Sequence, residues 1–176
     1  MAKKSSSEPK ARRPKAKTAA RMYHFMLNPY PGDRLSGCPA CRQKTGQRKL
    51  PLVIRVEPGH EILLNYTCRY CTKCDLLMRN KVEIESHLTQ IFMANAPQVI
   101  GNEYFILGTM ERKAWRENMH NQRPLSEMLD QVHPFKEYSE MRRTYGGWFH
   151  KDVEPPEEPP PPSEEWVKQK PKLKRK

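Results

Sequence analysis

The stretches Cys38-Pro39-Ala40-Cys41 and Cys68-Arg69-Tyr70-Cys71-Thr72-Lys73-Cys74 together contain all five cysteines of the 176-residue chain. Between them, residues 50–56 and 61–67 are apolar and rich in strand-forming side chains, and Glu57-Pro58-Gly59-His60 separates them as a turn. Two Cys-x-x-Cys pairs on either side of a β-hairpin predict a structural metal site, because each pair aims two thiolates at one ion. The pattern therefore predicts a closed tetrahedral centre bound by four cysteines.

The second stretch offers three cysteines for two ligand places. Cys68 with Cys71 and Cys71 with Cys74 both have the required spacing. The residue after the second cysteine of such a turn often needs a positive φ, which Asp75 tolerates better than the β-branched Thr72. This comparison favours Cys38, Cys41, Cys71 and Cys74 as the ligands and keeps Cys68 as the alternative ligand.

The nature of the ion follows from the chemistry of the thiolates. An odd number of cysteines without a secretory signal favours a reducing compartment over disulfides. Four thiolates at this spacing favour one zinc ion, and iron is the alternative because it binds the same ligands. Over about residues 36–78 the chain resembles the zinc-ribbon group of proteins, on the strength of its cysteines and its hairpin. The resemblance implies a metal-bound fold, in a group that includes nucleic-acid-binding, ribosomal, transcription and purely structural proteins.

Positive charge is concentrated at the two ends of the chain. Within a net charge of +12, residues 1–22 hold eight Lys or Arg and one Glu, and residues 166–176 hold six Lys or Arg and no acid. Residues 152–165 hold six acids and no base. Basic segments bind polyanions, because each phosphate that they neutralise releases counterions. The ends therefore predict contact with nucleic acid, and the alternative is that they only increase solubility.

The composition divides the chain into four parts. We expect a disordered basic tail at residues 1–21, a zinc ribbon plus a helix at 22–95, an α/β portion packed on the ribbon at 96–150, and an acidic proline-rich linker with a basic tail at 151–176. The predicted class is α+β, with a zinc-ribbon β-hairpin core, amphipathic helices and disordered basic tails. No run approaches the roughly 20 apolar residues of a membrane span, so we expect a cytoplasmic protein without a membrane partner.

Hydrophobic periodicity predicts the remaining elements. Strands are expected at residues 23–27 and 75–78, and a hairpin of two further strands is expected around Gly101-Asn102. Helical segments are expected at residues 81–94 with Asn80 as N-cap, at 111–116, at 124–132, and in the spacing from Phe135 to Tyr145.

Basic and aromatic side chains near the cysteines are the candidate contacts to nucleic acid. Residues 42–49, expected as a loop between the first cysteine pair and the hairpin, hold four basic residues and no acid. Aromatic rings next to cations stack on bases, although Tyr70 and Trp115 are equally good candidates for packing in the core. The candidates are Arg42, Lys44, Arg48, Lys49, Arg69, Tyr70, Lys73 and Trp115.

The sequence contains none of the common catalytic motifs, such as a glycine-rich phosphate loop, HExxH or G-x-S-x-G. We therefore expect a non-catalytic zinc-binding module that contacts nucleic acid through its basic tails and the ribbon loop, with RNA or a ribonucleoprotein preferred over DNA. The alternative is a zinc-stabilised adaptor that binds a protein partner without touching nucleic acid. A steep loss of affinity with salt distinguishes the first from the second.

Overall fold

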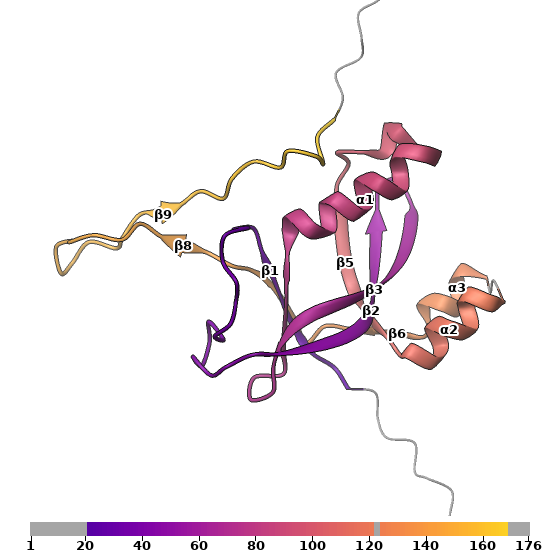
Figure 1. Ribbon diagram of the computed structural model, residues 1–176, viewed down its shortest axis with the longest axis horizontal. Helices are drawn as coiled ribbons and strands as arrows, with labels where there is room; N and C mark the ends of the chain where they lie inside the picture. The colour runs from indigo at the N-terminus through magenta and orange to yellow at the C-terminus, as the bar shows by residue number, and fades with distance from the viewer. Residues whose placement is uncertain (1–20, 122–123, 169–176) are drawn as a thin grey trace, which may run out of the picture.

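A computed structural model describes residues 21–121 and 124–168 of the chain. Seven strands form one mixed sheet that curls into a half barrel, in the order β6-β5-β2-β3-β4-β1-β7 (Figure 1). These strands are β1 (His24–Asn28), β2 (Gly46–Val56), β3 (His60–Cys71), β4 (Leu76–Asn80), β5 (Tyr104–Met110), β6 (Val132–Pro134) and β7 (Glu137–Glu140). The helices are α1 (Lys81–Asn95), the 3-10 turn Pro97–Val99, α2 (Arg112–His120) and α3 (Leu125–Leu129).

The predicted hairpin forms the centre of this sheet. Strands β2 and β3 pair antiparallel from Gly46 opposite Tyr70 to Val56 opposite His60. The expectation of a simple zinc-ribbon hairpin is wrong, because β5 pairs with the other edge of β2 and β4 pairs with β3. The physical reason lies in β2, where five successive residues from Leu50 to Ile54 are buried. A strand that is buried on both faces needs strand neighbours and covering layers that a two-stranded ribbon does not supply.

Strand β1 ties the end of the chain to the metal-binding part. It pairs in parallel with β4 on one side and with β7 on the other. The predicted continuation of helix from Phe135 to Tyr145 is wrong, since residues 137–140 are strand. The aromatic spacing serves a different contact: the Phe25 ring stacks on Phe135 at 4.7 Å and on Tyr138 at 5.8 Å between centroids. Packing across the sheet therefore determines this segment.

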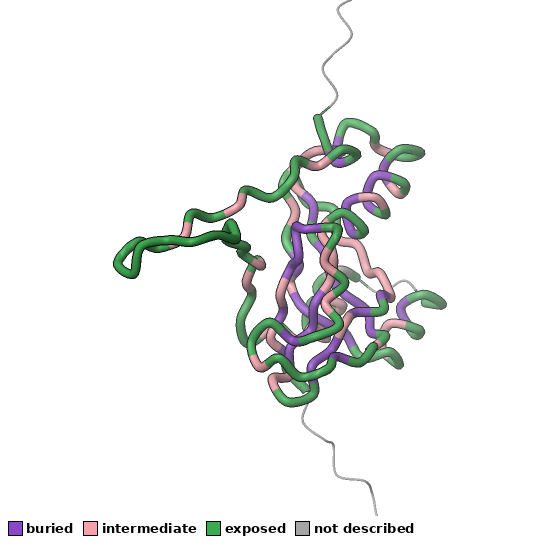
Figure 2. The backbone as a smooth tube through the Cα atoms, turned by 60° about the vertical axis from the view of Figure 1, so that its left-hand side comes forward, coloured by how far each residue is buried: buried purple, intermediate pink, exposed green. Residues whose placement is uncertain are grey.

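Helix α1 confirms the prediction for residues 81–94. Its buried residues Ile84, Leu88 and Phe92 recur every four positions and belong to the main core. Figure 2 shows buried and exposed stretches alternating along the helical turns. Asn80 does not cap the helix with its side chain. Its Oδ1 instead accepts a hydrogen bond of 2.7 Å from Asn28 Nδ2, which joins β4 to β1.

The region after α1 differs from the predicted hairpin around Gly101-Asn102. Only Tyr104–Met110 is a strand, while residues 97–99 form a 3-10 turn that buries Val99. Gly101 has φ +81°, and a Cβ there would overlap the backbone N of Lys168, so glycine is needed for the close approach of the C-terminal segment. The predicted helix at 111–116 is confirmed and extends to His120, whereas the helix expected at 124–132 ends at Leu129.

The acidic, proline-rich segment leaves the body and returns to it. Strand β9 (Glu157–Glu158) pairs antiparallel with β8 (Arg143–Thr144) in an arm that extends from the sheet (Figure 1). Trp166 then enters the core, where it is 7% exposed and its Nε1 donates a hydrogen bond of 2.8 Å to the Asn102 carbonyl. The predicted basic tails lie outside the described residues, apart from Arg21 and residues 166–168. None of the helices in the described part has the length and apolar character of a membrane span.

Candidate metal centre and the basic surface beside it

The first cysteine turn precedes β2. The N–H of Arg42 donates to the Cys38 carbonyl at 2.8 Å, and the N–H of Cys38 donates to the Gln43 carbonyl at 2.8 Å. These bonds close the turn tightly enough that Arg42 adopts φ +60°, in the left-handed region. The turn therefore holds Cys38 and Cys41 side by side, with both side chains directed to one point.

The second cysteine turn joins β3 to β4. Cys71 is the last residue of β3, and Leu76 begins β4. Between them, Asp75 adopts φ +49°. This is the positive φ that the sequence predicts for the residue after the second cysteine of the pair Cys71 and Cys74. The Asp75 carbonyl also accepts a hydrogen bond of 3.0 Å from the N–H of His24, so β1 supports this turn.

The two turns bring together the sulfur atoms of Cys38, Cys41, Cys71 and Cys74, all within 4.8 Å of one another. The Sγ atoms of Cys41 and Cys71 lie 3.5 Å apart, and those of Cys38 and Cys74 lie 4.0 Å apart. A tetrahedral ion with Zn–S bonds of about 2.3 Å places its sulfurs about 3.8 Å apart, which these distances match. None of the cysteines is in a disulfide. The cluster can therefore bind one metal ion such as Zn²⁺.

The surroundings of the cluster suit thiolate ligands. Cys38 and Cys71 are buried with Leu76 and Met78, so the centre has an apolar wall on one side. The N–H of Gln43 donates to the sulfur of Cys41 and lowers the pKa of this thiol to about 7. Contact with the Cys41 sulfur raises the pKa of Cys74 to about 12, and burial raises the pKa of Cys38. A ligand must be deprotonated to bind the metal, so Cys41 is the first thiolate of the cluster and the others would release their protons as the ion binds.

Cys68 lies apart from this cluster. It is fully buried in the main core together with Tyr66 and Leu50. Burial raises the pKa of the Cys68 thiol to about 12, so this cysteine is a neutral, apolar side chain. The structure thus joins four of the five cysteines and leaves Cys68 as part of the sheet's packing.

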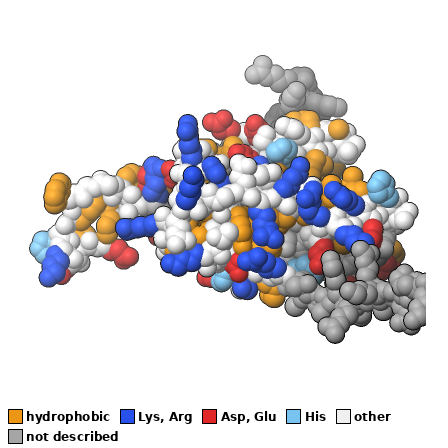
Figure 3. All heavy atoms as spheres, turned by 60° about the horizontal axis from the view of Figure 1, so that its bottom comes forward, with side chains coloured by type: hydrophobic (Ala, Val, Ile, Leu, Met, Phe, Trp, Pro, Cys, Tyr) orange, Lys and Arg blue, Asp and Glu red, His pale blue; other side chains and the backbone are white. Residues whose placement is uncertain are grey.

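Positive charge is concentrated in residues 21–80, the segment that holds the four-cysteine cluster. Residues 21–80 contain ten Lys or Arg and only four Asp or Glu, whereas residues 81–168 contain fifteen acids and ten bases. Three of the ten cations form ion pairs, Arg21 with Asp75, Arg55 with Glu57 and Arg79 with Glu83. Within the described residues the other seven have no acidic partner. Figure 3 shows Lys and Arg side chains spread over one face of the molecule, with fewer acidic groups between them.

The structure places most of the predicted nucleic-acid contacts on this surface. Strand β2 begins at Gly46, so the expected loop at residues 42–49 is shorter than predicted and its last two cations lie on a strand. Arg48 and Arg69 are half-buried, and the exposed members are Arg42, Lys44, Lys49 and Lys73.

The two predicted aromatic contacts lie deeper. Tyr70 is 5% exposed, and its hydroxyl donates a hydrogen bond of 2.7 Å to Asp75. Its ring and that of Tyr23 both contact the guanidinium of Arg48, at 5.1 and 5.2 Å from the ring centroids. Trp115 is half-buried on α2, which lies far from the cysteine turns along the sequence. Sequence reasoning missed Tyr23 and Arg21, which both contact the ring of Tyr70. These three residues and Arg48 gather near the carboxylate of Asp75, and their positions in the sequence follow no spacing that a known motif would reveal.

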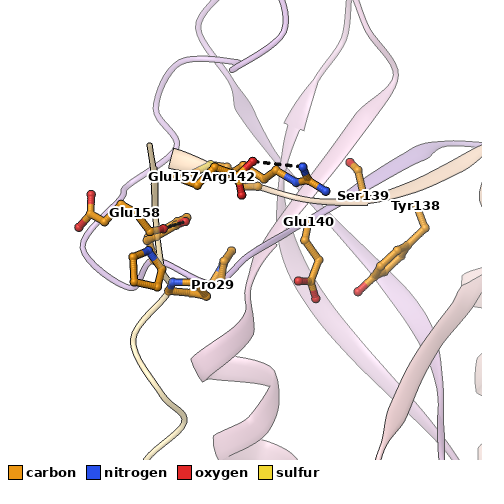
Figure 4. Close-up of a pocket in the computed structure, with 11 residues that line it drawn as sticks. Pro29, Tyr138, Ser139, Glu140, Arg142, Glu157 and Glu158 are labelled. Atoms are coloured by element: carbon orange, nitrogen blue, oxygen red, sulfur yellow. Dashed lines mark hydrogen bonds and ion pairs between the residues drawn. The ribbon is translucent and has the colours of Figure 1, made fainter. Parts of the chain in front are cut away.

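A cavity of about 860 Å³ lies elsewhere, between β7 and the acidic arm. Figure 4 shows its polar lining, in which Arg142 pairs with Glu157 at 3.1 Å and Glu140 points into the space between β7 and the arm. Three carboxylates and one arginine line this cavity. Its charge is opposite to that of residues 21–80, so it is unsuited to a polyanion.

Comparison of the chain with models of protein families, with curated proteins and with solved structures finds no significant match. The proposals that follow therefore rest on the residues and geometry of this chain alone.

Proposed function

We propose that the chain is a non-catalytic module that binds one zinc ion and contacts nucleic acid, with RNA or a ribonucleoprotein preferred over DNA. The observation that carries this proposal is the separation of charge along the chain: seven of the ten cations in residues 21–80, the segment that holds the four-cysteine cluster, have no acidic partner among the described residues. Like charges repel one another across such a surface. A bound polyanion removes this repulsion and gains the free energy of counterion release.

Zinc is the proposed ion because all four ligand places are filled by cysteine. A catalytic zinc site keeps one position for water, with three protein ligands, whereas this cluster supplies four sulfurs. The ion then has a structural role: it fixes the two turns and so fixes the cations that they carry, Arg42, Lys44 and Lys73. Iron binds the same thiolates, and metal analysis of the purified protein distinguishes the two.

RNA is placed ahead of DNA because the seven unpaired cations of residues 21–80 lie outside helices. The nine-residue α2 is the exception among the described helices, because it exposes Arg112, Lys113 and Arg116. An α-helix that reads the DNA major groove offers an exposed basic face. Helix α1, the longest described helix, packs on the sheet through Ile84 and Leu88 and carries Glu83 in its first turn. The cations of residues 21–80 lie instead on strands and irregular turns, which suit the irregular backbone of single-stranded or folded RNA.

The test is the salt dependence of binding. Fluorescence anisotropy with an end-labelled single-stranded RNA of about 20 nucleotides, and with a DNA duplex of equal length, gives the affinity across a series of KCl concentrations. We expect the logarithm of the RNA affinity to fall linearly with the logarithm of salt, with a slope of about −0.7 for each phosphate contacted. Absence of binding at low salt, or an affinity independent of salt, would overturn the proposal.

One observation favours a second candidate, an adaptor for a protein partner. At the tip of the arm Trp148 is fully exposed, and Tyr145 and Phe149 are exposed beside it. Aromatic residues of this kind are frequent centres of protein interfaces. A stoichiometric protein partner that stays bound at 0.5 M salt to the wild-type chain and dissociates from Trp148→Ala would favour the adaptor over nucleic-acid binding.

A further inference from the structure

A second cavity, of about 370 Å³, lies at the open edge of β2. Strand β5 pairs with β2 only from Leu52 onward, and in the described chain no strand pairs with the β2 edge at residues 46–51. The end of β5, the start of α2 and the residues just before β1 surround this edge. The cavity is therefore formed by segments that are far apart in the sequence.

Cationic side chains from separate segments converge on this cavity. Its lining includes His133 and one carboxylate, that of Glu111, together with five cations: Arg21, Arg48, Lys49, Arg112 and Lys113. Arg21 pairs with Asp75 and Lys113 pairs with Glu117. Arg48, Lys49 and Arg112 have no acidic partner among the described residues. Three unneutralised cations around one cavity repel one another, and an anion between them relieves this repulsion.

Arg48 is held ready for such an anion. Its guanidinium contacts both rings of the edge-to-face pair Tyr23 and Tyr70, at 5.2 and 5.1 Å from their centroids. Asp75 holds the Tyr70 ring in place, because its carboxylate accepts hydrogen bonds from the Tyr70 hydroxyl at 2.7 Å and from Arg21 at 2.5 Å. A guanidinium that is already oriented loses little entropy on binding, and its planar donors match two oxygens of a phosphate.

Helix α2 adds its N-terminus to this cavity. The helix is nine residues long and starts with two cations, Arg112 and Lys113, after the N-cap residue Glu111, whose side chain forms no capping hydrogen bond. Cations at a helix N-terminus are unfavourable, because the helix dipole already places partial positive charge there, and Glu111 is the one acid in the cavity lining that offsets them. A phosphate in the cavity would interact with both the dipole and the cations.

We propose that this cavity binds a phosphate group of a nucleic-acid backbone, which gives the proposed nucleic-acid surface a defined anchoring site and rests on that proposed function. A backbone phosphate fits better than a free one, since residues 1–20, which lead directly into Arg21 at the cavity, hold seven Lys or Arg and one Glu. Both cysteine turns are connected to this cavity. Strand β2, which carries Arg48 and Lys49, follows the first turn, and Asp75 of the second turn pairs with Arg21. A polyanion anchored here reaches both sets of cations.

The test compares two pairs of substitutions with the same change of charge. The cavity pair is Lys49→Gln with Arg112→Gln, and the control pair is Arg116→Gln with Lys151→Gln, which are exposed and do not line the cavity. The single-stranded RNA affinity of each full-length, metal-loaded protein is measured across a KCl series. Circular dichroism melting of each protein controls for folding.

We expect the cavity pair to bind RNA about tenfold more weakly than the control pair at low salt. Its salt slope is expected to be shallower by about 1.4, which corresponds to two lost phosphate contacts on a single strand. Arg48→Lys, which keeps the charge and loses the planar donors, should weaken RNA binding while preserving most of the slope. Equal losses in the two pairs would overturn the cavity assignment and leave the proposed function intact.

Wild-type protein without salt-dependent RNA binding would overturn the proposed function and this inference together. In that case calorimetric titration with inorganic phosphate separates the sources. Saturable phosphate binding to the wild-type chain that is lost in the cavity pair would assign the cavity to a free phosphate instead of a nucleic-acid backbone.

Discussion

At the residue scale, the position after each cysteine pair determines how the metal-binding turn closes. Arg42 and Asp75 both adopt a positive φ, which costs a side chain other than glycine about 1–2 kcal/mol. Asp75 offsets this cost with hydrogen bonds to Tyr70 and Arg21. Arg42 has no such bond from its side chain in the described part, and its exposed guanidinium faces solvent. The exposed Arg42 side chain therefore adds a charge to this surface and does not stabilise the turn.

Arg42→Gly should separate stability from binding. Glycine removes the left-handed strain but increases the entropy of the unfolded chain, so the free energy of unfolding should rise by up to about 1 kcal/mol. RNA affinity should fall, because one cation is lost. Chemical denaturation of the zinc-loaded protein and anisotropy measure the two effects. Arg42→Ala is the control that loses the charge and keeps the strain; a glycine variant less stable than this control would contradict the account.

Cys68 should contribute to the packing of the core, and Cys74 should contribute to metal binding. Cys68→Ala should keep one metal ion per chain and lower the free energy of unfolding by about 1–3 kcal/mol, because it leaves a small cavity in the core. Cys74→Ala should lose tight metal binding, since three sulfurs remain. Elemental analysis after dialysis gives the metal content of both variants. Loss of the metal in Cys68→Ala together with its retention in Cys74→Ala would reverse the ligand assignment.

The buried Tyr66 and the half-buried Tyr104 predict how stability depends on alkaline pH. Burial raises the pKa of Tyr66 to about 12, and burial together with Glu85 raises the pKa of Tyr104 as well. A pKa above the ordinary value of about 10 means that the folded state holds the proton more tightly than the unfolded state. The stabilisation is therefore complete below pH 10 and is lost as the pH rises through the folded-state pKa.

Denaturant unfolding at a series of pH values from 8 to 11 measures this effect, and absorbance at 295 nm follows tyrosine ionisation. We expect the free energy of unfolding to decrease above pH 10. Tyr66→Phe should make the decrease shallower, whereas Tyr145→Phe, at an exposed position, should leave it unchanged. Stability that stays constant up to pH 11 would show that these hydroxyls are not buried.

At the element scale, the C-terminal segment is a strap that closes the core. Trp166 packs on Phe92 of α1 and Tyr104 of β5, with ring centroids 6.1 and 6.0 Å away. Its indole N–H donates to the Asn102 carbonyl, and Gly101 leaves room for the backbone of residues 167–168. A segment that composition marks as a linker thus completes the packing of a helix and a strand.

Trp166→Ala and Gly101→Ala should both detach this strap. The first should lower the free energy of unfolding by about 3 kcal/mol or more, since it removes a buried indole. The second should also be destabilising, because its Cβ overlaps the strap and φ is positive. The double variant should be less destabilised than the sum of the two, as both remove the same contact. Additive effects in denaturation experiments would contradict a shared contact.

The elements also show what the sequence can predict. Local signals predict α1, the β2–β3 hairpin and the clustering of Cys38, Cys41, Cys71 and Cys74, because helical periodicity, a Pro-Gly turn and cysteine spacing act within a few residues. The parallel pairing of β1 with β7 joins residues more than a hundred positions apart, and no local signal reports it. The spacing of Phe135 and Tyr138 predicts a helix for the same reason, since their partner Phe25 lies at the other end of the chain.

At the scale of the whole molecule, the cysteine turns and most of the unpaired cations of the described chain belong to one segment, residues 21–80. The cysteine turns lie at the ends of β2, β3 and β4, and these cations lie on the same strands, on the turns or in the loop before them. Acidic residues are concentrated after residue 80, although the sheet places Glu137 of β7 in the lining of the same pocket as Cys74. Metal removal should loosen the cysteine turns first, because the ion joins them. Hydrogen exchange of the chelator-treated protein should increase at residues 36–46 and 71–76 before it increases in α1, and uniform exchange would contradict this order.

The central claim is that four cysteines hold one zinc ion. Native mass spectrometry of the full chain, purified without chelator at low salt, tests it most directly. We expect one zinc per chain and no readily reactive thiol in the folded protein, because four sulfurs bind the ion and Cys68 is buried in the core; unfolding releases the ion and exposes all five thiols. A metal-free mass, together with reactive thiols at the cysteine turns of the folded protein, would contradict this, because the two turns would then have no ion to join them.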